Sequence, residues 1–279
     1  MAQYKYILEV KTRMNIFINH RDYQVENNET VLQAALRNKL TSIPSLCYHP
    51  ALRAEASCRL CVVEVKGEAG LYTACTLKVR EGLSVLTKTA AVVASRRRTL
   101  RYLLNRNPHH KLLQKWGEEY GADGLGGAQT LPPEAQTLPN CLLCGLCVRA
   151  CRQLGCEALQ FIGRGVDRHV QRLPAFRKTA CIGCHACERL CPAQAIHSEI
   201  TDSNLKWEHW EEEHHMATCT MCHKMLATQA ALDYVKNKVP ASRLRIQLCS
   251  ECKRILSQSP LSRSKGEKTQ APGSMLKSK

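Results

Sequence analysis

Hydrophobic and polar positions alternate along two short runs near the start of the chain. In residues 14–26 this alternation predicts two strands on either side of an H-R-D turn. The next run, N-N-E-T-V-L-Q-A-A-L-R-N-K-L, starts with capping residues and predicts a helix whose inner face carries Val31, Leu32, Ala35 and Leu36. Three β-rich runs follow, and the whole order predicts a small ubiquitin-like (β-grasp) α+β domain that ends near residue 88.

From residue 90 the pattern becomes helical and is then interrupted. Residues 90–120 place Leu100, Leu103 and Leu104 on one helical stripe, and Gly and Pro accumulate in a linker at 121–140. We therefore expect a modular α+β protein. Its segments are a first domain at 1–88, a helical segment and linker at 89–140, a cysteine-repeat domain at 141–200, a second cysteine module at 201–255 and a disordered basic tail at 256–279.

Cysteine content changes this picture most. The chain has 17 cysteines in 279 residues but only three Phe and three Trp, so bound cofactors are expected to replace part of the usual core. The start of the chain lacks the apolar run of a signal peptide, and no stretch approaches the ~20 apolar residues of a membrane span. We expect a cytoplasmic chain whose thiols stay reduced and act as metal ligands rather than forming disulfides.

The net charge of +16 is concentrated in the tail and in the block S-R-R-R-T-L-R-Y-L-L-N-R at 95–106. Such a block is typical of the solvated face of a helix, and it can also be a surface for an acidic partner protein or nucleic acid. Neither basic stretch carries interleaved aromatic residues that could stack on bases. Nucleic acid is therefore the weaker interpretation, and the block is expected to be a docking surface for a partner subunit.

The most specific signal is a motif of four cysteines that occurs twice. Each copy has the spacing C-x2-C-x2-C-x3-C of bacterial two-[4Fe–4S] ferredoxins, in which the last cysteine of one motif binds the other cluster. This rule assigns one cluster to Cys141, Cys144, Cys147 and Cys191, and the other to Cys181, Cys184, Cys187 and Cys151. Cys156 belongs to neither motif and is expected to be a small buried residue.

A second set of cysteines lies within the predicted first domain. Their spacing, C-x10-C-x2-C-x13-C, supplies the four thiolates that a [2Fe–2S] cluster needs, although it differs from the plant-type ferredoxin spacing. Tetrahedral zinc is the alternative for the same four ligands. The residues are Cys47, Cys58, Cys61 and Cys75.

Taken in order, four motifs resemble the iron–sulfur segment of the large peripheral-arm subunit of complex I. They are S-L-C-Y-H-P, A-S-C-R-L-C-V-V-E-V, C-L-L-C-G-L-C-V-R-A-C and C-I-G-C-H-A-C-E-R-L-C-P. The diaphorase small subunit of NAD-linked [NiFe] hydrogenases and the N-terminal regions of [FeFe] hydrogenases and some formate dehydrogenases are similar. The resemblance spans residues 14–200. It implies a hetero-oligomeric subunit, without catalytic residues of its own, that relays electrons between an NAD(P)-linked flavoprotein subunit and a catalytic subunit such as hydrogenase or formate dehydrogenase.

The chain departs from this family at residues 107–121. The family normally holds a third [4Fe–4S] cluster there with one histidine and three cysteines, but this stretch contains His109 and His110 and no cysteine. A lone imidazole cannot hold a cubane, so this cluster is not expected. The two histidines are then expected to be surface or helix-capping residues.

Four cysteines near the end of the chain form C-x2-C-x26-C-x2-C. The spacing suits structural zinc, while the neighbouring redox motifs tip the prediction slightly toward a further [4Fe–4S] cluster. His223 is a possible competing ligand, and the stretch M-L-A-T-Q-A-A-L-D-Y-V-K between the pairs is expected to be helical. The four residues are Cys219, Cys222, Cys249 and Cys252.

The expected function is thus a multi-cluster electron relay with one [2Fe–2S] cluster, two [4Fe–4S] clusters and a fourth metal site. Two alternatives stay open. A zinc-containing nucleic-acid-binding protein would use the C-x2-C pairs and the positive charge, and a stand-alone soluble polyferredoxin would carry the same clusters without a partner.

Overall fold

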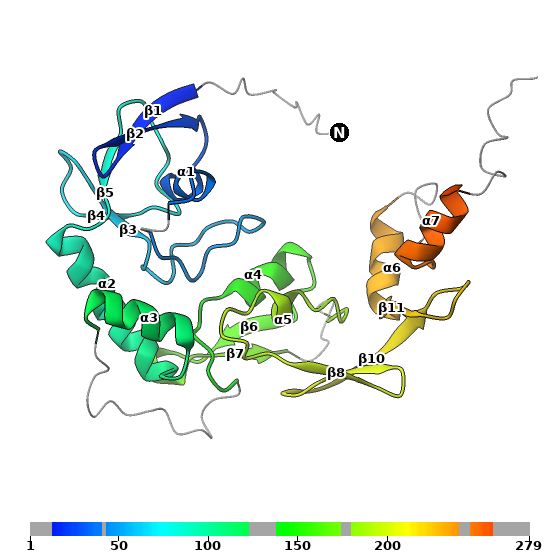
Figure 1. Cartoon of the computed structure of the whole chain (residues 1–279). Coiled ribbons are helices and arrows are strands. Elements are labelled where there is room, and N and C mark those ends of the chain that lie inside the picture. The colour runs from blue at the N-terminus through cyan, green and yellow to red at the C-terminus, as the bar shows by residue number, and fades with distance from the viewer. Residues whose placement is uncertain (1–12, 41–42, 123–137, 174–179, 240–245, 259–279) are drawn as a thin grey trace, which may run out of the picture. The chain divides into compact units, whose positions relative to one another are not determined.

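The computed structural model describes residues 13–40, 43–122, 138–173, 180–239 and 246–258 (Figure 1). These residues divide into two compact units. The first comprises the chain up to residue 181 together with 185–198 and 207–211, and the second comprises 182–184, 199–206 and the chain from 212 onward. Among the described residues, no helix combines the length and the apolar character that crossing a bilayer requires.

The N-terminal part of the first unit is a five-stranded sheet with strand order β2-β1-β5-β3-β4. β1 pairs antiparallel with β2 and parallel with β5, and β3 lies antiparallel to both β4 and β5. The predicted strands are confirmed, although β4 is shorter than its β-rich run. The bounds are β1 Arg13–Ile18, β2 Arg21–Glu26, β3 Val62–Val65, β4 Leu71–Thr73 and β5 Ser84–Leu86.

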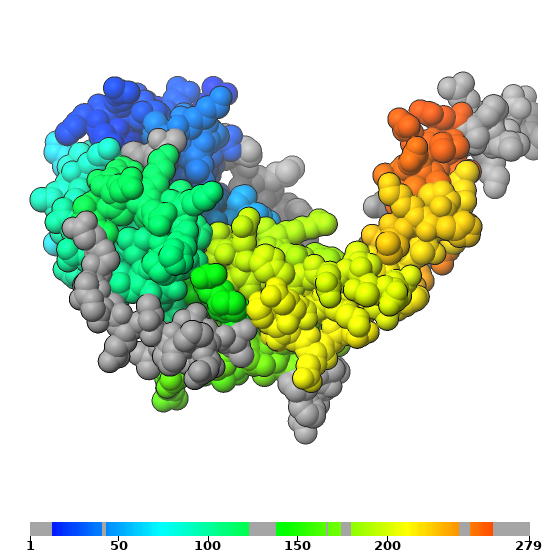
Figure 2. Space-filling view, turned by 60° about the horizontal axis from the view of Figure 1, so that its bottom comes forward, coloured from blue at the N-terminus to red at the C-terminus, as the bar shows by residue number. Residues whose placement is uncertain are grey.

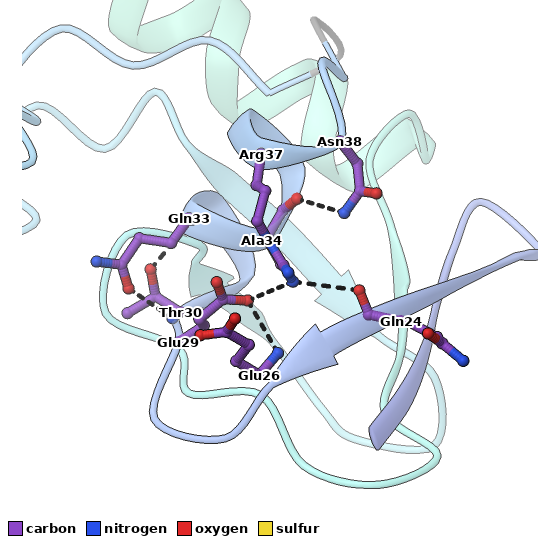
Figure 3. Close-up of polar contacts among 8 residues, drawn as sticks. All are labelled: Gln24, Glu26, Glu29, Thr30, Gln33, Ala34, Arg37 and Asn38. Atoms are coloured by element: carbon purple, nitrogen blue, oxygen red, sulfur yellow. Dashed lines mark hydrogen bonds and ion pairs between the residues drawn. The ribbon is translucent and has the colours of Figure 1, made fainter. Parts of the chain in front are cut away.

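Helix α1 (Val31–Arg37) begins with a complete capping box, as the sequence pattern predicts. The Thr30 side chain accepts from the backbone N–H of Gln33, and the Gln33 side chain accepts from the N–H of Thr30 at 2.8 Å (Figure 3). Arg37 at the other end forms an ion pair with Glu29 at 2.8 Å. The prediction that Leu36 faces the core is wrong: its side chain is half exposed, because it lies at the edge of the helical face that Val31, Leu32, Ala34 and Ala35 bury.

The core of this sheet domain lies between α1 and one face of the sheet. It consists of aliphatic side chains from every strand except β4 and includes two cysteines, Cys61 and Cys75, at 1% exposure each. The two cysteines are therefore minor members of a core that consists mainly of aliphatic side chains. The largest of its fully buried members are Ile16, Ile18, Leu32, Val25, Val31 and Val63.

Two helices follow where one helical pattern was predicted. α2 (Ala90–Arg106) and α3 (Lys111–Tyr120) are separated at Asn107 and Pro108, because proline disfavours helical geometry at the residue before it. Leu100 and Leu104 of α2 are buried against Leu60 of the sheet domain, in agreement with the predicted stripe. The surfaces of α2 and α3 (green) continue that of the sheet domain (blue and cyan) in Figure 2.

Short elements carry or border the two ferredoxin-type cysteine repeats. α4 (Leu146–Gln153) starts at Gly145, whose φ of 74° requires a residue tolerant of the left-handed region. α5 (Ala186–Arg189) carries part of the second repeat and contacts α4. A two-stranded antiparallel sheet follows α4, made of β6 (Leu159–Ile162) and β7 (His169–Arg172), with a short 3-10 turn, η2 (Gly165–Asp167), between the strands.

The last part of the chain has a four-stranded sheet of order β11-β10-β9-β8 and two helices. The expected helix between the last two cysteine pairs is only partly right, because its first residues, M-L-A-T, form β11 against β10 before α6 begins. The bounds are β8 Ser198–Thr201, β9 Asn204–Trp207, β10 Trp210–Thr218, β11 Met225–Thr228, α6 Gln229–Lys238 and α7 Ser250–Gln258.

Candidate metal centres

The cysteines of the sheet domain lie in two pairs. Cys47 and Cys75 come from loops, while Cys58 and Cys61 precede β3. The thiols of Cys47 and Cys58 are hydrogen-bonded to each other, and so are those of Cys61 and Cys75. The two pairs are also close enough for the Cys47 charge to act on Cys75. Such an arrangement suits a [2Fe–2S] cluster, in which each of the two iron ions binds two thiolates.

Local hydrogen bonds divide these thiols into stronger and weaker acids. The Cys58 thiol, and then Ser57, lower the pKa of Cys47 to about 5 despite its burial. The backbone N–H of Cys58 also donates to the Cys47 sulfur at 3.4 Å. In the other pair, the hydrogen bond with Cys75 followed by burial raises the pKa of Cys61. The loop therefore favours a thiolate at Cys47 before any metal binds.

The first ferredoxin motif lies in an apolar environment. Burial is the main cause that raises the pKa of Cys144 to about 12, and it raises the pKa values of Cys141 and Cys147 as well. Cys191, the last cysteine of the second motif, is close enough to raise all three further. Cys187 of the second motif also raises the pKa of Cys147, so the grouping of Cys141, Cys144 and Cys147 with Cys191 stays a prediction. Because such buried thiols disfavour an uncompensated negative charge, they suit a cation-containing cluster.

The second motif is distributed over more elements. Cys151 lies in the last turn of α4, and Cys187 lies on α5. The backbone N–H of Ala158 donates to the Cys151 sulfur at 3.2 Å, and that of Ala195 donates to the Cys191 sulfur at 3.3 Å. Cys181 is half-buried, and Cys184 is exposed and is counted with the second unit. The grouping of Cys151 with Cys181, Cys184 and Cys187 stays a prediction.

Arg149 connects the sheet domain to the first ferredoxin motif. It lies on α4 between Cys147 and Cys151, is 7% exposed, and donates through its guanidinium to the backbone carbonyls of Cys47 and Arg53. Ser57, which neighbours Cys58, donates to the carbonyl of Cys144 at 3.3 Å. The two cysteine loops are therefore hydrogen-bonded directly to each other.

The same two loops share apolar packing. Leu46 and Leu60 of the sheet domain form one buried cluster with Leu142, and Cys58 and Cys144 pack against it. Cys47 and Cys144 are near enough to interact electrostatically. Ser57 is exposed and Cys58 and Cys144 are half-buried, so this boundary is buried only in part, and the two cysteine groups are joined within the first unit by hydrogen bonds and the shared apolar cluster.

The region of the missing family cluster has a different role in this chain. His110 is the N-cap of α3, accepting from the N–H of Leu113 through Nδ1 at 3.3 Å, while its Nε2 lies 2.8 Å from the carbonyl of Pro192. His109 is exposed. These positions agree with the predicted capping and surface roles.

The last four cysteines form the tightest group of ligand atoms. Within the described part of the chain, they are the one set of at least three Cys, His, Asp or Glu residues whose ligand atoms all lie within 4.8 Å of one another. The Cys222 and Cys249 sulfurs are 3.7 Å apart. Cys219, Cys249 and Cys252 are buried, whereas Cys222 is exposed. This group can hold a metal.

The donor sets fit the groups that the motifs predict. Each candidate site offers sulfur ligands, and backbone N–H groups already point at sulfur in the sheet domain, in the ferredoxin motifs and in the last group. Such bonds stabilise thiolates and tune metal sites. Cys156 is buried outside these groups, as predicted.

Two functional residues were missed at the sequence level. Arg96 is fully buried and donates to the carbonyls of Leu60 and Val62, on both sides of Cys61, and to the Tyr120 hydroxyl. It therefore cannot belong to a docking surface, and that part of the interpretation of 95–106 is wrong. Arg149 was the other, and no signal in the motif C-V-R-A-C distinguishes it from a surface arginine.

The comparisons with known proteins agree with the motifs. Residues 11–90 match the 2Fe-2S iron-sulfur cluster binding domain, and residues 174–197 match the 4Fe-4S binding domain. A chain of the NADH-quinone oxidoreductase from Rhizobium meliloti is 29% identical over 206 residues, which cover 66% of this chain and 24% of that protein. The HndD chain of the NADP-reducing hydrogenase from Solidesulfovibrio fructosivorans is 29% identical over 214 residues, covering 66% of this chain and 36% of that protein.

A solved structure is similar as well. A chain of the NAD+-reducing [NiFe]-hydrogenase in the H2-reduced state superimposes with a TM-score of 0.55 at 28% identity, covering 70% of this chain and 87% of that chain. The predicted resemblance to iron–sulfur subunits of NADH-linked and hydrogenase-type oxidoreductases is confirmed. This chain spans only about a quarter of the length of the similar protein from Rhizobium meliloti.

Proposed function

We propose that this chain is the electron-relay subunit of a cytoplasmic oxidoreductase complex. In this role it connects an NAD(P)-linked flavoprotein subunit to a catalytic subunit such as a hydrogenase or formate dehydrogenase. The iron–sulfur domains at 11–90 and 174–197 support the relay. The names of the similar proteins, which are subunits of NADH- and NADP-linked enzymes, support the choice of partners.

The proposed ligand sets follow the motifs. A ubiquitin-like (β-grasp) domain holds one [2Fe–2S] cluster, with Cys47 and Cys58 on one iron and Cys61 and Cys75 on the other, supported by the two hydrogen-bonded pairs. A two-[4Fe–4S] domain holds its clusters by the crossed pattern. The sets are Cys141, Cys144, Cys147 and Cys191 for one cluster and Cys181, Cys184, Cys187 and Cys151 for the other. Bound clusters supply one-electron transfer.

The observation that carries the relay is the direct junction between two cysteine groups. Arg149 and Ser57 tie the loop of Cys47 and Cys58 to the motif of Cys144 and Cys147. The residues of this junction join the two groups by hydrogen bonds, pack apolar side chains against both and place a positive charge beside them. Such a direct junction suits a relay because electron transfer depends steeply on distance and surroundings. His110 caps a helix where the family has a further cluster. We therefore propose that electrons leave the [2Fe–2S] site of the sheet domain through this junction instead.

The test uses the full chain, purified anaerobically with its natural partners. About ten irons per chain and EPR signals that broaden each other when both cluster types are reduced support the relay. A colourless protein whose metal is zinc, or cluster signals without mutual broadening, contradicts it. Recovery as a monomer that shuttles without any flavoprotein favours a polyferredoxin instead.

Arg149→Leu examines the junction itself. Because it leaves the carbonyls of Cys47 and Arg53 without their donor, we expect weaker mutual broadening and a less stable protein, by about 2–4 kcal/mol. Arg152→Leu changes an exposed arginine on the same helix and serves as the control. Equal spectra for both variants would remove Arg149 from the proposed junction.

A further inference from the structure

The spacing of the four sulfurs in the last cysteine group is that of ligands on a single ion. All four lie within 4.8 Å of one another, and the Cys222 and Cys249 sulfurs are 3.7 Å apart. Ligands at 2.3 Å from a tetrahedral zinc ion stand roughly 3.8 Å apart. A [4Fe–4S] cluster instead binds each thiolate at a separate iron corner, so its ligands must lie further apart. This geometry disfavours the cubane to which the sequence alone pointed.

The backbone around these sulfurs has the form of two tight metal-binding turns. At the first turn, Cys219 donates through its N–H to the carbonyl of Lys224 at 2.8 Å, and His223 takes a left-handed φ of 58°. The two turns are joined by a bond from the Thr220 N–H to the Gln247 carbonyl at 3.0 Å. The first turn thus folds back on itself and is held against the second by this backbone bond and by the Thr220 hydroxyl, which donates to the same carbonyl at 3.4 Å.

Amide donors stabilise the thiolates at this site. The N–H of Cys249 donates to the Cys219 sulfur, and the N–H of Cys252 donates to the Cys249 sulfur, both at 3.4 Å. His223 is exposed and is not part of the four-ligand group. The site therefore offers four sulfur ligands and leaves no position open for a substrate, which is the pattern of structural zinc.

The described residues around this site form almost no core apart from these sulfurs. Their buried cluster consists of Cys219, Cys249 and Cys252, with Leu226 and Leu248 partly buried against them. In the described residues, α6 buries no side chain and α7 buries only Cys252. Several apolar side chains of this region are exposed instead, namely Met221, Met225, Val235, Ile255 and Leu256.

A segment with so small a core cannot offset the entropy of folding by burial of apolar surface. We propose that Cys219, Cys222, Cys249 and Cys252 bind one zinc ion, which replaces the hydrophobic core of the segment at 218–258 and makes its folding depend on metal. This site is structural and separate from the relay, so the inference stands whether or not the proposed function does. Zinc does not change its oxidation state under physiological conditions, so the site ends the chain of redox centres rather than extending it.

Metal analysis of the full-length protein tests the assignment. We expect one zinc per chain in protein purified anaerobically from cells supplied with both zinc and iron. Cys249→Ser should lose that zinc, keep the iron content of the unmodified protein and become sensitive to proteolysis within 218–258. His223→Asn, which tolerates the same left-handed φ, should keep the zinc and serve as the matched control.

Three results would overturn the proposal. They are a wild-type protein without zinc, a loss of about four irons with no change in zinc on replacing Cys249, and a single iron in place of zinc with the visible absorption of a ferric tetrathiolate. If Cys249→Ser proves insoluble, the zinc content of the wild-type protein and of Cys222→Ser, which changes the exposed ligand, still decides the question.

Discussion

The sheet domain at 13–88 and the segment at 218–258 both hold four cysteines, but their interiors differ. In the sheet domain, Cys61 and Cys75 lie among many fully buried aliphatic side chains from four strands and a helix. In the described residues of the segment at 218–258, the buried apolar cluster is three cysteines, with two partly buried leucines packed against them. The same ligand type therefore serves a domain that has its own core in one case and supplies the core in the other.

This contrast connects cofactor chemistry to folding energetics. Where apolar burial stabilises the fold, the protein can orient donors toward a metal ligand, as the N–H and thiol donors around Cys47 do. Where burial is slight, metal binding itself contributes the free energy of folding. Each of the following experiments measures one side of this difference.

The largest expected effect follows metal removal. Selective extraction of zinc should abolish hydrogen-exchange protection of α6 and α7, because metal binding contributes on the order of 10 kcal/mol in small zinc domains. Amides of β1, β3 and β5 should stay protected, since their core is aliphatic. If α6 and α7 retain their hydrogen-exchange protection after the zinc has been removed, the folding of the segment at 218–258 does not depend on metal.

A smaller effect is expected from the buried arginine of the first unit. Arg96→Met should destabilise the sheet domain by about 3 kcal/mol, because it leaves the carbonyls of Leu60 and Val62 without donors. Arg98→Met, which changes an exposed neighbour, should stay within about 0.5 kcal/mol of wild type. Urea unfolding followed by far-UV circular dichroism measures both, and equal midpoints would show that the Arg96 contacts add nothing.

The smallest effects are expected at two matching N-caps. Thr30 caps α1 and Thr228 caps α6, each accepting a backbone N–H through its hydroxyl. Replacing either by alanine should cost about 1 kcal/mol of local stability, measured by hydrogen exchange of the capped helix. Thr228 also donates to the carbonyl of Ile182, so its replacement should additionally loosen the loop of Gly183.

The serine variants are the controls for these caps. Thr30→Ser and Thr228→Ser keep the hydroxyl and should retain near-normal protection. If Thr228→Ala leaves hydrogen exchange in the loop at 182–184 unchanged, the bond from Thr228 to Ile182 contributes nothing to the stability of that loop.

Much of the sheet domain was predictable because its signals are local. Alternation placed β1 and β2, and the pair Thr30 and Gln33 marked the start of α1. Arg96 was not predictable, since the run S-R-R-R has the pattern of a solvated helix and its burial depends on carbonyls about 35 residues away in the chain. The strand β11 was missed for a similar reason, because its pairing with β10 outweighs the helical pattern of its residues.

The candidate metal sites also differ in how much of them the sequence predicts. Spacing alone is enough to predict a grouping of the ferredoxin cysteines, because that motif is specific to one kind of cluster. Spacing could not choose a metal for Cys219, Cys222, Cys249 and Cys252, since two C-x2-C pairs suit several ions. That choice depends on distances between sulfurs, which arise only when the two turns are joined through Thr220 and Gln247.

Arg149 has a consequence for how the protein matures. Its guanidinium contacts the loop of Cys47, and its backbone belongs to the helix that carries Cys147 and Cys151. By linkage, whatever orders one of these segments lowers the entropic cost of ordering the other. We therefore expect cofactor insertion at the two proposed sites to be cooperative, so that a chain loaded at only one site should be the rarer species.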